Sequence, residues 1–270
     1  MATIMSDELR FHLKIKNGDV GRYVILPGDP GRVPLIAQKL ENAEQIAQNR
    51  EYNIYTGFLS GVKVSVCSTG IGGPSAAIAV EELIDSGADT FIRVGTSGGI
   101  DLSVFGGDLI IAEAAIRAEG TSYEYLPQGY PALADYSVTS ALVKAAEKLS
   151  GSEPGERWHV GVVHSKDSFY GETNPERSAV CDNITSRWES YVRCGCLTSE
   201  MECAAIYAVG LVRSNLQKKI RCGGVLTALW NAERSKKNLP DTICNSSERA
   251  IQCAVDAIRL LIAEDNATGC

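Results

Sequence analysis

Two glycine-rich turns enclose a short apolar strand that carries an arginine, and this block constrains the fold of the chain most. The turns are residues 69–75 (TGIGGPS) and 95–99 (GTSGG), and the strand before the second turn is residues 90–95 (TFIRVG). Residues 90–95 are typical of a fully buried parallel strand, where an unpaired guanidinium such as that of Arg93 is costly. Ligands of open α/β sheets bind at the carboxyl ends of the strands, so we expect Arg93 to meet an anion or a carboxylate there.

The composition is that of one ordinary globular domain. The 270 residues are 44% hydrophobic and 22% charged, and we expect residues 1–270 to form a single domain. The formal net charge is −7 and no basic run occurs, which argues against nucleic acid or an acidic membrane as a partner. No signal peptide precedes His12 and no apolar run approaches about 18 residues, so we expect a cytoplasmic protein. Any anionic ligand must then be held by local arginines.

Nine cysteines lie at irregular spacings, several of them within apolar helix or strand patterns. We therefore expect buried, reduced thiols and no disulfide framework. Cys194 and Cys196 do not have CxxC spacing, and the chain has only three histidines. A zinc site is not expected on these grounds.

Short apolar strands alternate along the chain with longer amphipathic segments. We expect strands near residues 21–27, 52–58, 62–68, 90–95, 108–117, 158–165 and 220–228, and helices near 33–40, 74–84, 138–149, 180–193, 201–214 and 246–263. Residues 150–157 and 235–247 have the composition of exposed loops. The alternation predicts an α/β protein in which helices cover both faces of a mixed, mostly parallel central sheet, as a three-layer α/β/α domain.

Residues 28–32 (GDPGR) follow a strand and precede a helix, which is a place where proteins bind anions. Backbone N–H groups of this turn and the guanidinium of Arg32 offer donors to such a ligand. A plain Pro/Gly turn with a solvated arginine is the alternative. The glycine clusters lack the spacing of dinucleotide-binding and P-loop motifs, so both of those functions are excluded.

Arg93 forms a second candidate anion site together with Gly95 and Thr96. The alternative is a buried arginine that pairs with a carboxylate such as Glu82 or Glu202. Both interpretations place a negative charge against the guanidinium, which burial of an arginine requires.

Two further segments carry possible binding groups. Residues 199–202 (SEME) place two carboxylates at a helix start, where they either complement the helix dipole or accept hydrogen bonds from vicinal hydroxyls. Residues 166–170 (KDSFY), with Arg177 beyond them, combine an aromatic platform with cationic donors that suit a planar base with carbonyl groups. A mixed-charge loop that caps a strand is the alternative for this second segment.

Residues 68–83 (STGIGGPSAAIAVEEL) resemble, position for position, the signature of the uridine phosphorylase and purine nucleoside phosphorylase family. The resemblance covers nearly the whole chain and includes residues 11–13, 28–32, 49–51, 93–98, 166–171 and 199–202. Residues 166–171, 187–189, 199–202 and 231–234 look most like uridine phosphorylases of Gram-positive bacteria. The resemblance implies the nucleoside phosphorylase fold and reversible phosphorolysis of uridine to uracil and ribose 1-phosphate in pyrimidine salvage. It also implies that inorganic phosphate is a co-substrate and that no cofactor is required.

The resemblance also implies roles for individual residues at the phosphate and the ribose. Inorganic phosphate would be bound by residues of two segments, namely Gly28, Arg32, Arg93 and Thr96. Arg50 would reach the phosphate site of a neighbouring subunit, and His12 would cross the same interface to the ribose 5′-hydroxyl. The ribose would be lined by Met201 and Glu202, where Glu202 accepts the 2′- and 3′-hydroxyls and Glu200 supports that turn. Arg93, Thr96 and Glu202 are the residues expected to act in catalysis.

At the base, the resemblance implies that Phe169 stacks near the ring and that Lys166 and Arg177 approach the uracil edge. In some members, residues corresponding to Glu51, Ile71 and Ser75 surround a monovalent cation at the dimer interface. Because His12 and Arg50 act only when a neighbour presents them, we expect a homodimer as the minimal active unit.

Phosphorolysis passes through a cation-like ribosyl group, so the site needs a positioned phosphate and stabilisation of the departing base. Arginines that hold the phosphate supply proximity, and the phosphate stabilises the cation. No nucleophilic side chain is needed, which agrees with the absence of a convincing Ser/His/Asp or Cys/His arrangement.

The base specificity follows from residues that are missing. Purine-cleaving relatives place an aspartate after the strand 220–228, whereas residues 226–231 (LTALWN) contain no acid before Glu233. The loop 171–177 (GETNPER) lacks the glutamine that typically contacts uracil in relatives, so Lys166, Arg177 or main-chain groups would take its place. Thymidine and deoxyuridine stay open as substrates. A purine nucleoside phosphorylase, a nucleosidase of the same fold and a non-catalytic nucleoside-binding protein are the alternative functions.

Overall fold

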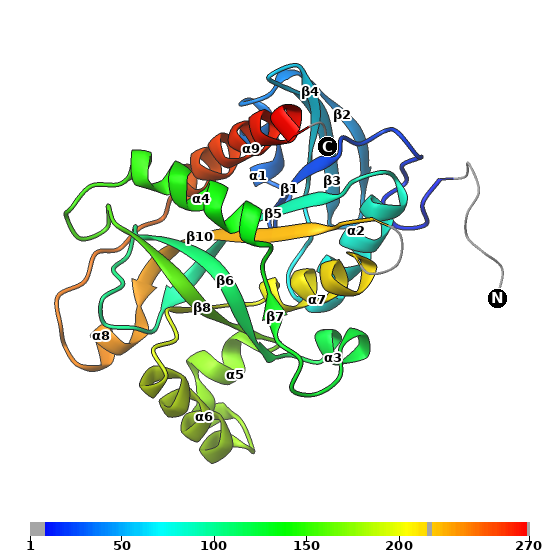
Figure 1. The fold of residues 1–270 in the computed structure, drawn as a ribbon. Helices are drawn as coiled ribbons and strands as arrows, with labels where there is room; N and C mark the ends of the chain where they lie inside the picture. Colours follow the sequence, from blue (N-terminus) through cyan, green and yellow to red (C-terminus); the bar gives the residue numbers. More distant parts are fainter. Residues whose placement is uncertain (1–8, 215–217, 269–270) are drawn as a thin grey trace.

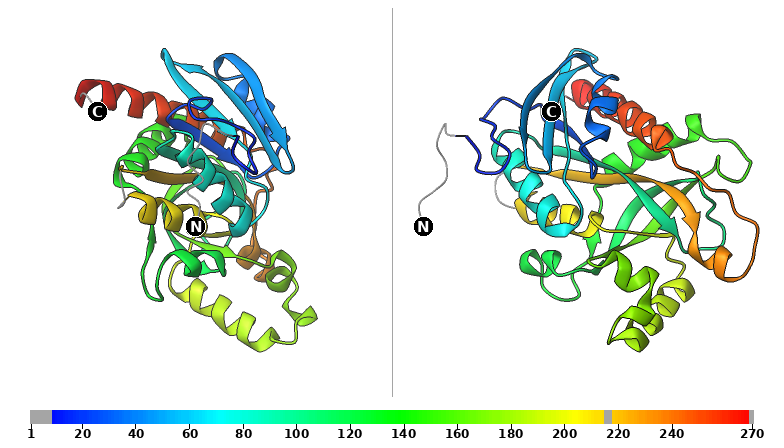
Figure 2. Two further views of the ribbon diagram at one scale, coloured as in Figure 1. Left: turned by 90° about the vertical axis from the view of Figure 1, so that its right-hand side faces the viewer. Right: turned by 180° about the vertical axis from the view of Figure 1, so that it is seen from behind.

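Helices cover both faces of a central sheet in the computed structural model, which describes residues 9–214 and 218–268 (Figure 1). On one face, α4 (Tyr136–Leu149) and α9 (Glu248–Thr268) pack side by side, and α1 (Arg32–Ala37) shares their apolar core. The other face carries α2 (Gly73–Asp85) beside α7 (Cys203–Ser214), as Figure 2 shows. Each helix buries an apolar stripe against the strands, so two hydrophobic cores lie on opposite sides of the sheet.

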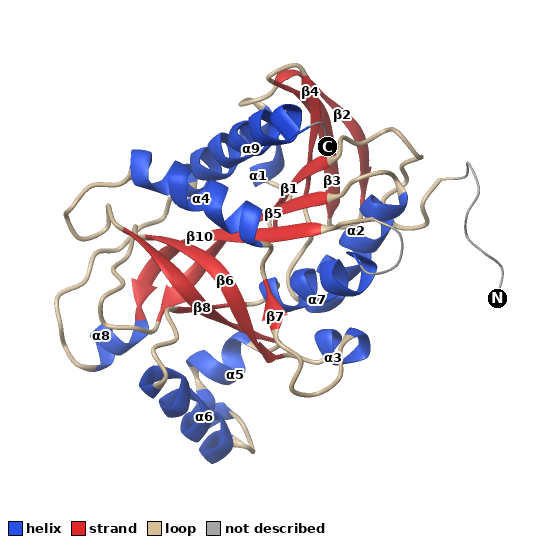
Figure 3. Ribbon diagram, viewed as in Figure 1, coloured by secondary structure: helices blue, strands red, loops and turns tan. Residues whose placement is uncertain are grey.

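The sheet of the described residues has ten strands, which Figure 3 shows in red between the helices. In chain order they are β1 (Tyr23–Pro27), β2 (Glu41–Asn49), β3 (Tyr52–Leu59), β4 (Val62–Cys67), β5 (Thr90–Gly99), β6 (Leu109–Ala118), β7 (Ala132–Leu133), β8 (Trp158–Lys166), β9 (Thr198–Glu200) and β10 (Arg221–Asn231). Parallel pairings join β1 to β4 and β5, β5 to β10, and β8 to β6 and β9. The other pairings are antiparallel, so the expected three-layer α/β/α fold with a mixed central sheet is confirmed.

Strand β5 joins two parts of the sheet. It lies between β1 and β10 as a parallel strand, and its last residues, Gly98 and Gly99, pair with β9 in antiparallel orientation. Because β10, β6, β8 and β9 pair in succession, they form a closed circuit with β5. This closure brings the end of β8 at Lys166 and the end of β9 at Glu200 toward the middle of β5.

The structure differs from the sequence-based expectation at three places. Residues 95–99 are the second half of β5 instead of a turn, because they continue to pair with β10 and β9. β2 was not expected, since its sequence (ENAEQIAQN) is polar and the strand is an exposed edge paired only with β3. Short elements also form where no helix or strand is expected: α3 (Thr121–Tyr125), α5 (Phe169–Thr173), the 3₁₀ helix Pro175–Arg177, α8 (Ala232–Lys236) and the strands β7 and β9.

The segment expected near 180–193 is α6 (Cys181–Arg193), which projects from the lower part of the molecule in Figure 1 and has no buried residue. A search of the described helices finds none with the length and apolar character of a membrane-spanning helix.

The described cysteines are free, and Cys67 and Cys203 are buried as expected, whereas Cys194 is exposed. Cys270 lies outside the described residues.

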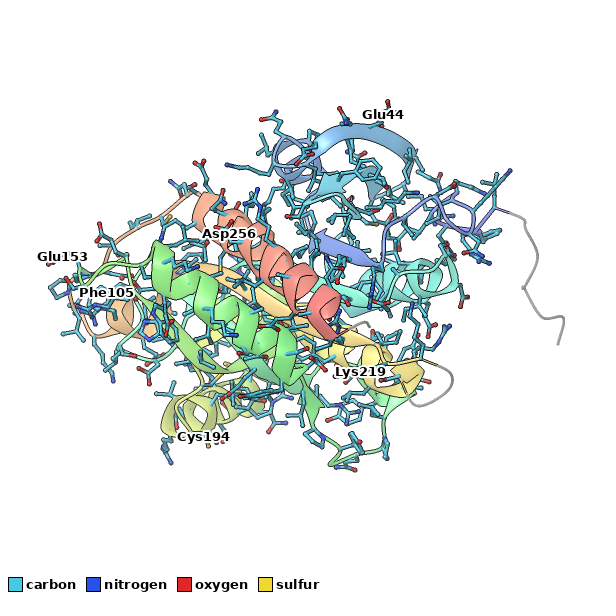
Figure 4. The ribbon with its side chains drawn as sticks, turned by 45° about the horizontal axis from the view of Figure 1, so that its top comes forward. Glu44, Phe105, Glu153, Cys194, Lys219 and Asp256 are labelled. Carbon is cyan, nitrogen blue, oxygen red and sulfur yellow. The ribbon has the colours of Figure 1, made fainter. Side chains whose placement is uncertain are left out.

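A buried ion pair fastens α9 to the amino ends of the central strands. The guanidinium of Arg221 on β10 donates to both carboxylate oxygens of Asp265, at 2.9 and 2.6 Å, and the Tyr23 hydroxyl donates to Asp265 at 2.5 Å. Burial alone raises the pKa of Asp265, but the hydrogen bonds from Arg221 and Tyr23 outweigh burial and hold that pKa below its usual value. Figure 4 shows α9 beside α4 on this face, with Asp256 labelled.

Replacing Asp265 with asparagine is expected to lower the free energy of unfolding by about 1.5–3 kcal/mol at neutral pH, the contribution typical of hydrogen bonds to a charged group. The pKa of Asp265 is lowered in the folded state, so this stabilisation is present above the unfolded pKa of about 3.9 and disappears as the pH falls through the folded value. Urea denaturation at several pH values measures the loss. The matched control is Glu264→Gln on the exposed side of α9, which we expect to change stability by less than about 1 kcal/mol; equal effects of both variants would contradict this account.

Candidate active site

One cavity of about 890 Å³ opens where the central strands end. Its wall is built from the turn after β1, the second half of β5, the ends of β8, β9 and β10, and the short helices α5 and α8. The cavity collects most of the residues expected from the sequence: Gly28, Arg32, Glu51, Ile71, Arg93, Thr96, Lys166, Phe169, Glu200, Met201 and Glu202.

Arg93 is 3% exposed and pairs with two carboxylates. Its Nε lies 2.9 Å from Glu200 Oε2, and its Nη2 contacts Glu202 Oε2. Glu202 was one of the two partners considered from the sequence. The other, Glu82, lies elsewhere and contacts His12. Burial alone lowers the pKa of Arg93, but Glu202 and Glu200 raise it above its ordinary value, so the guanidinium is a fixed cation.

The third nitrogen of the Arg93 guanidinium, Nη1, differs from the other two in its surroundings. Arg93 Nη1 is buried and has no hydrogen-bond partner among the described residues. A Cβ atom on Gly28 would lie 3.9 Å from Nη1, so the turn after β1 faces this nitrogen at close range. A Cβ atom on Gly95 would come within 2.8 Å of Nη2, so a larger residue at this position would displace the guanidinium. A buried cationic donor without a partner is costly, and an anion at this place would satisfy it.

Arg32 adds a second cation to the same end of the cavity. Its side chain is about one-fifth exposed, and its Nε lies 4.0 Å from Asp29 Oδ2. Burial lowers the pKa of Arg32, and the nearby Arg93 lowers it further, although Asp29 opposes both. Two guanidinium groups that face one space repel each other, and this repulsion favours an anion between them. Thr96 on β5 lines the same end of the cavity.

Glu200 and Glu202 are only two residues apart but have opposite pKa shifts. Glu200 accepts hydrogen bonds from the Ser165 hydroxyl and from the backbone N–H groups of Glu202 and Cys203, at 2.8 and 3.0 Å. Burial opposes its ionisation, but Arg93 and these donors outweigh burial and lower the pKa of Glu200. The pKa of Glu202 is raised, first by burial and also by the charge of Glu200. Glu200 is therefore a fixed anion that positions Arg93.

Glu202 differs from Glu200 in how much of its hydrogen-bonding capacity is used. One of its oxygens accepts from the Gly72 backbone N–H at 2.6 Å, and the other contacts Arg93. A carboxylate offers about four acceptor positions, so Glu202 can accept further donors from the cavity. Pairs of carboxylates whose environments shift their pKa values apart are typical of active sites with divided roles.

The opposite end of the cavity is aromatic. Lys166 Nζ donates to Ser199 Oγ at 2.5 Å and lies 5.7 Å from the centre of the Phe169 ring. Trp188 and Trp230 also line the cavity. Neither tryptophan is expected as a cavity residue from the sequence. Trp188 lies on the exposed helix α6, which is far from the other cavity residues in the sequence and comes near them only in the folded chain. Its indole N–H donates to Glu233 at 2.7 Å, which connects α6 to α8.

The structure places several expected site residues outside the cavity. His12 Nδ1 lies 2.7 Å from Glu82 Oε1, and Asn49 donates to the His12 carbonyl at 2.7 Å. Arg50 follows Asn49 directly and is exposed, so His12 and Arg50 lie close together on one surface of the chain. Arg177 is also exposed and does not line the cavity, which leaves Lys166 and Phe169 as the expected base contacts that do.

The residues expected around a cation come together at Gly70. A Cβ atom on Gly70 would lie 2.8 Å from Glu51 Cγ and 3.2 Å from Ser75 Oγ. Ser75 Oγ in turn donates to the Ile71 carbonyl at 3.3 Å. Gly70 has a φ of +70°, a conformation that favours glycine and allows this close packing.

The model of the phosphorylase superfamily matches residues 22–257 of this chain. The chain belongs to the phosphorylase superfamily. It is 46% identical to a uridine phosphorylase of Treponema pallidum over 266 residues, which cover 98% of this chain and 99% of the relative. A guanosine phosphorylase of Halorubrum lacusprofundi is 38% identical over 257 residues (93% and 98%), and a uridine phosphorylase of Escherichia coli is 35% identical over 265 residues (96% and 100%). The family expected from residues 68–83 is therefore confirmed, whereas the likeness to Gram-positive enzymes stays a prediction.

The opposite pKa shifts predict different effects of two similar substitutions on the stability of this superfamily member. Glu200→Gln removes a carboxylate that is stabilised as an anion, and it should lower the free energy of unfolding by about 1.5–3 kcal/mol. Because the pKa of Glu202 is raised in the folded state, its negative charge opposes folding at neutral pH, and Glu202→Gln should leave stability unchanged or increase it. Urea denaturation of both variants at pH 7 tests this, and a larger loss for Glu202→Gln would contradict the assignment.

Proposed function

We propose that this chain catalyses the reversible phosphorolysis of uridine to uracil and ribose 1-phosphate. The observation that carries the proposal is the unpaired, buried Nη1 of Arg93, which faces Gly28 at the end of the cavity that Arg32 and Thr96 also line. Inorganic phosphate fits this place because its oxygens accept several charge-assisted hydrogen bonds at once. The relatives named as uridine phosphorylases, which align along nearly the whole chain, support uridine as the nucleoside.

The order of residues along the cavity matches the parts of the substrates. The arginine end holds phosphate, Met201 and Glu202 line the ribose, and the aromatic end with Phe169 and Lys166 receives the base. Phosphate held below the ribose attacks the anomeric carbon as the bond to the base breaks, and its charge stabilises the cation-like sugar. Glu202 accepts the 2′- and 3′-hydroxyls. The ammonium group of Lys166 stabilises the negative charge on the departing uracil.

The proposal includes a homodimer that shares its active sites. His12 and Arg50 lie on one surface outside the cavity of their own chain, and Asn49 links the two positions by its hydrogen bond to His12. A neighbouring copy that presents this surface would supply a histidine to the ribose 5′-hydroxyl and an arginine to phosphate. Glu51, Ile71 and Ser75 would hold a monovalent cation near the same interface. A cytoplasmic location also belongs to the proposal.

A guanosine phosphorylase among the relatives makes purine phosphorolysis the second candidate function. Purine cleavage benefits from an acid near N7 of the base, and the first acid after β10 is Glu233. Glu233 is engaged by Trp188 and by Lys236, at 2.7 and 2.8 Å, and these hydrogen bonds hold its pKa below the usual value although burial opposes them. An ionised, occupied carboxylate does not donate a proton to N7. The Asn231 amide does not serve as a donor to N7 either, because its Nδ2 already donates to two backbone carbonyls.

Base release from uridine, inosine and guanosine, each with and without inorganic phosphate, tests the proposed reaction. We expect uracil release that depends on phosphate and a kcat/KM for uridine above the values for both purine nucleosides. Equal release without phosphate would identify a hydrolase. A higher kcat/KM for inosine or guanosine would contradict the assignment of uridine.

Arg32→Ala is expected to raise the KM for phosphate by about 10–100-fold, in line with the loss of one charge-assisted hydrogen bond. The KM for uridine should change much less, because Arg32 lies at the phosphate end of the cavity. Initial rates at varied phosphate and saturating uridine measure the effect. Arg193→Ala, at an exposed position of α6, is the control; a uniform loss of affinity for both substrates in Arg32→Ala would argue against a phosphate contact.

A further inference from the structure

Glu172 is a buried acid in the cavity wall to which the proposed reaction assigns no role. It lies on α5, its side chain is 16% exposed, and it faces the aromatic end of the cavity. Three groups from β8 and β9 approach it. Lys166 Nζ and Ser199 Oγ lie 3.6 and 3.4 Å from Oε2, and His164 Nε2 lies 3.2 Å from Oε1.

None of these contacts is a short, well-aligned hydrogen bond to the carboxylate. Charge-assisted N–H···O⁻ bonds are normally about 2.7–2.9 Å long. His164 Nε2 has no well-aligned partner among the described residues, and burial together with Lys166 lowers the pKa of His164 to about 3, so the ring is neutral. A carboxylate has about four acceptor positions. Glu172 therefore has free acceptor capacity toward the cavity.

The charges around Glu172 come from several elements. Burial raises the pKa of Glu172 above its ordinary value, although Lys166 on β8 and Arg187 on α6 are cations that favour its ionised form. Lys166 also donates to Ser199. An ammonium donor and a carboxylate acceptor thus lie 3.6 Å apart at the base end of one cavity.

We propose that Glu172 and Lys166 together recognise the amide edge of the base, with the carboxylate accepting the ring N–H and the ammonium donating to the adjacent carbonyl. This inference rests on the proposed function and adds the basis of its specificity for the base. Uracil presents this edge at N3–H and a neighbouring carbonyl, as hypoxanthine and guanine do at N1–H and C6=O. Cytosine and adenine present an acceptor nitrogen beside an amino group. The acceptor nitrogen would face the Glu172 carboxylate, and the amino group would face the Lys166 ammonium, so neither pair forms a hydrogen bond.

This pairing also accounts for a loop that lacks glutamine. A glutamine amide offers one acceptor and one donor from a single side chain. Here the acceptor comes from α5 and the donor from β8, so two residues provide what one amide would provide. A site built to hydrogen-bond a substrate N–H discriminates strongly against an analogue that lacks it, because the buried acceptor is then left unpaired.

The experiment compares uridine with 3-methyluridine, in which a methyl group replaces the ring N–H. We expect the kcat/KM ratio of uridine to 3-methyluridine to be large in the wild type and to fall by about 10–100-fold in Glu172→Ala, the effect of losing a hydrogen bond to a charged acceptor. Glu172→Gln keeps an acceptor oxygen, so it should lower the kcat/KM for uridine less than Glu172→Ala does, and it should increase turnover of cytidine because its amide N–H can donate to cytosine N3. Glu176→Gln, an exposed position in the same loop, is the matched control and should behave as the wild type.

An unchanged ratio in Glu172→Ala would overturn the inference, since a merely structural role lowers the activity on both substrates alike. If the wild type cleaves inosine but not uridine, the proposed function fails, whereas the role of Glu172 is then decided by the ratio of inosine to 1-methylinosine in the same variants. Absence of turnover of both nucleosides by the wild type would overturn both.

Discussion

The paired charges of Arg93, Glu200 and Glu202 are the interaction on which the rest of the site depends. A guanidinium and two carboxylates buried together are stable only when nearly every donor and acceptor is used. The chain satisfies Glu200 with the Ser165 hydroxyl and two backbone N–H groups at the start of α7. This fixes β9 against β5 and β8, so the circuit of strands and the cavity wall are held by the pair of Arg93 and Glu200.

The hydrogen-bonding capacity of these three residues is not fully used, and the unused donor and acceptor positions suggest where a ligand would bind. Arg93 retains one buried donor without a partner, while Glu202 retains acceptor capacity and carries its negative charge at a cost to folding. Both features are unfavourable by themselves, and under the proposed function phosphate and the ribose hydroxyls would supply the missing partners. Residues that bind substrate at the expense of stability are typical of active sites. Under the proposed function, Glu200 is therefore a positioning residue and Glu202 a substrate-contacting residue.

Local sequence predicted the layers of the fold and most of the cavity. Arg93 within an apolar strand, and the glycine turns near it, pointed to the site because a buried charge and a close backbone approach leave a signal in a short window. β2 left no such signal, since an exposed edge strand needs no apolar pattern. Trp188 and Glu172 could not be predicted as cavity residues, because α5 and α6 reach the cavity only through long-range packing. Arg177, which local composition favoured for the base, lies outside.

Phosphorus NMR of a mixture of the protein, uridine and inorganic phosphate tests the central claim most directly. If the donors of Arg93 and Arg32 hold phosphate for attack on the ribose, the phosphate resonance should decrease while that of a pentose 1-phosphate ester increases, in the same molar amount as the uracil released. Release of uracil with an unchanged phosphate resonance and the appearance of free ribose would contradict the account.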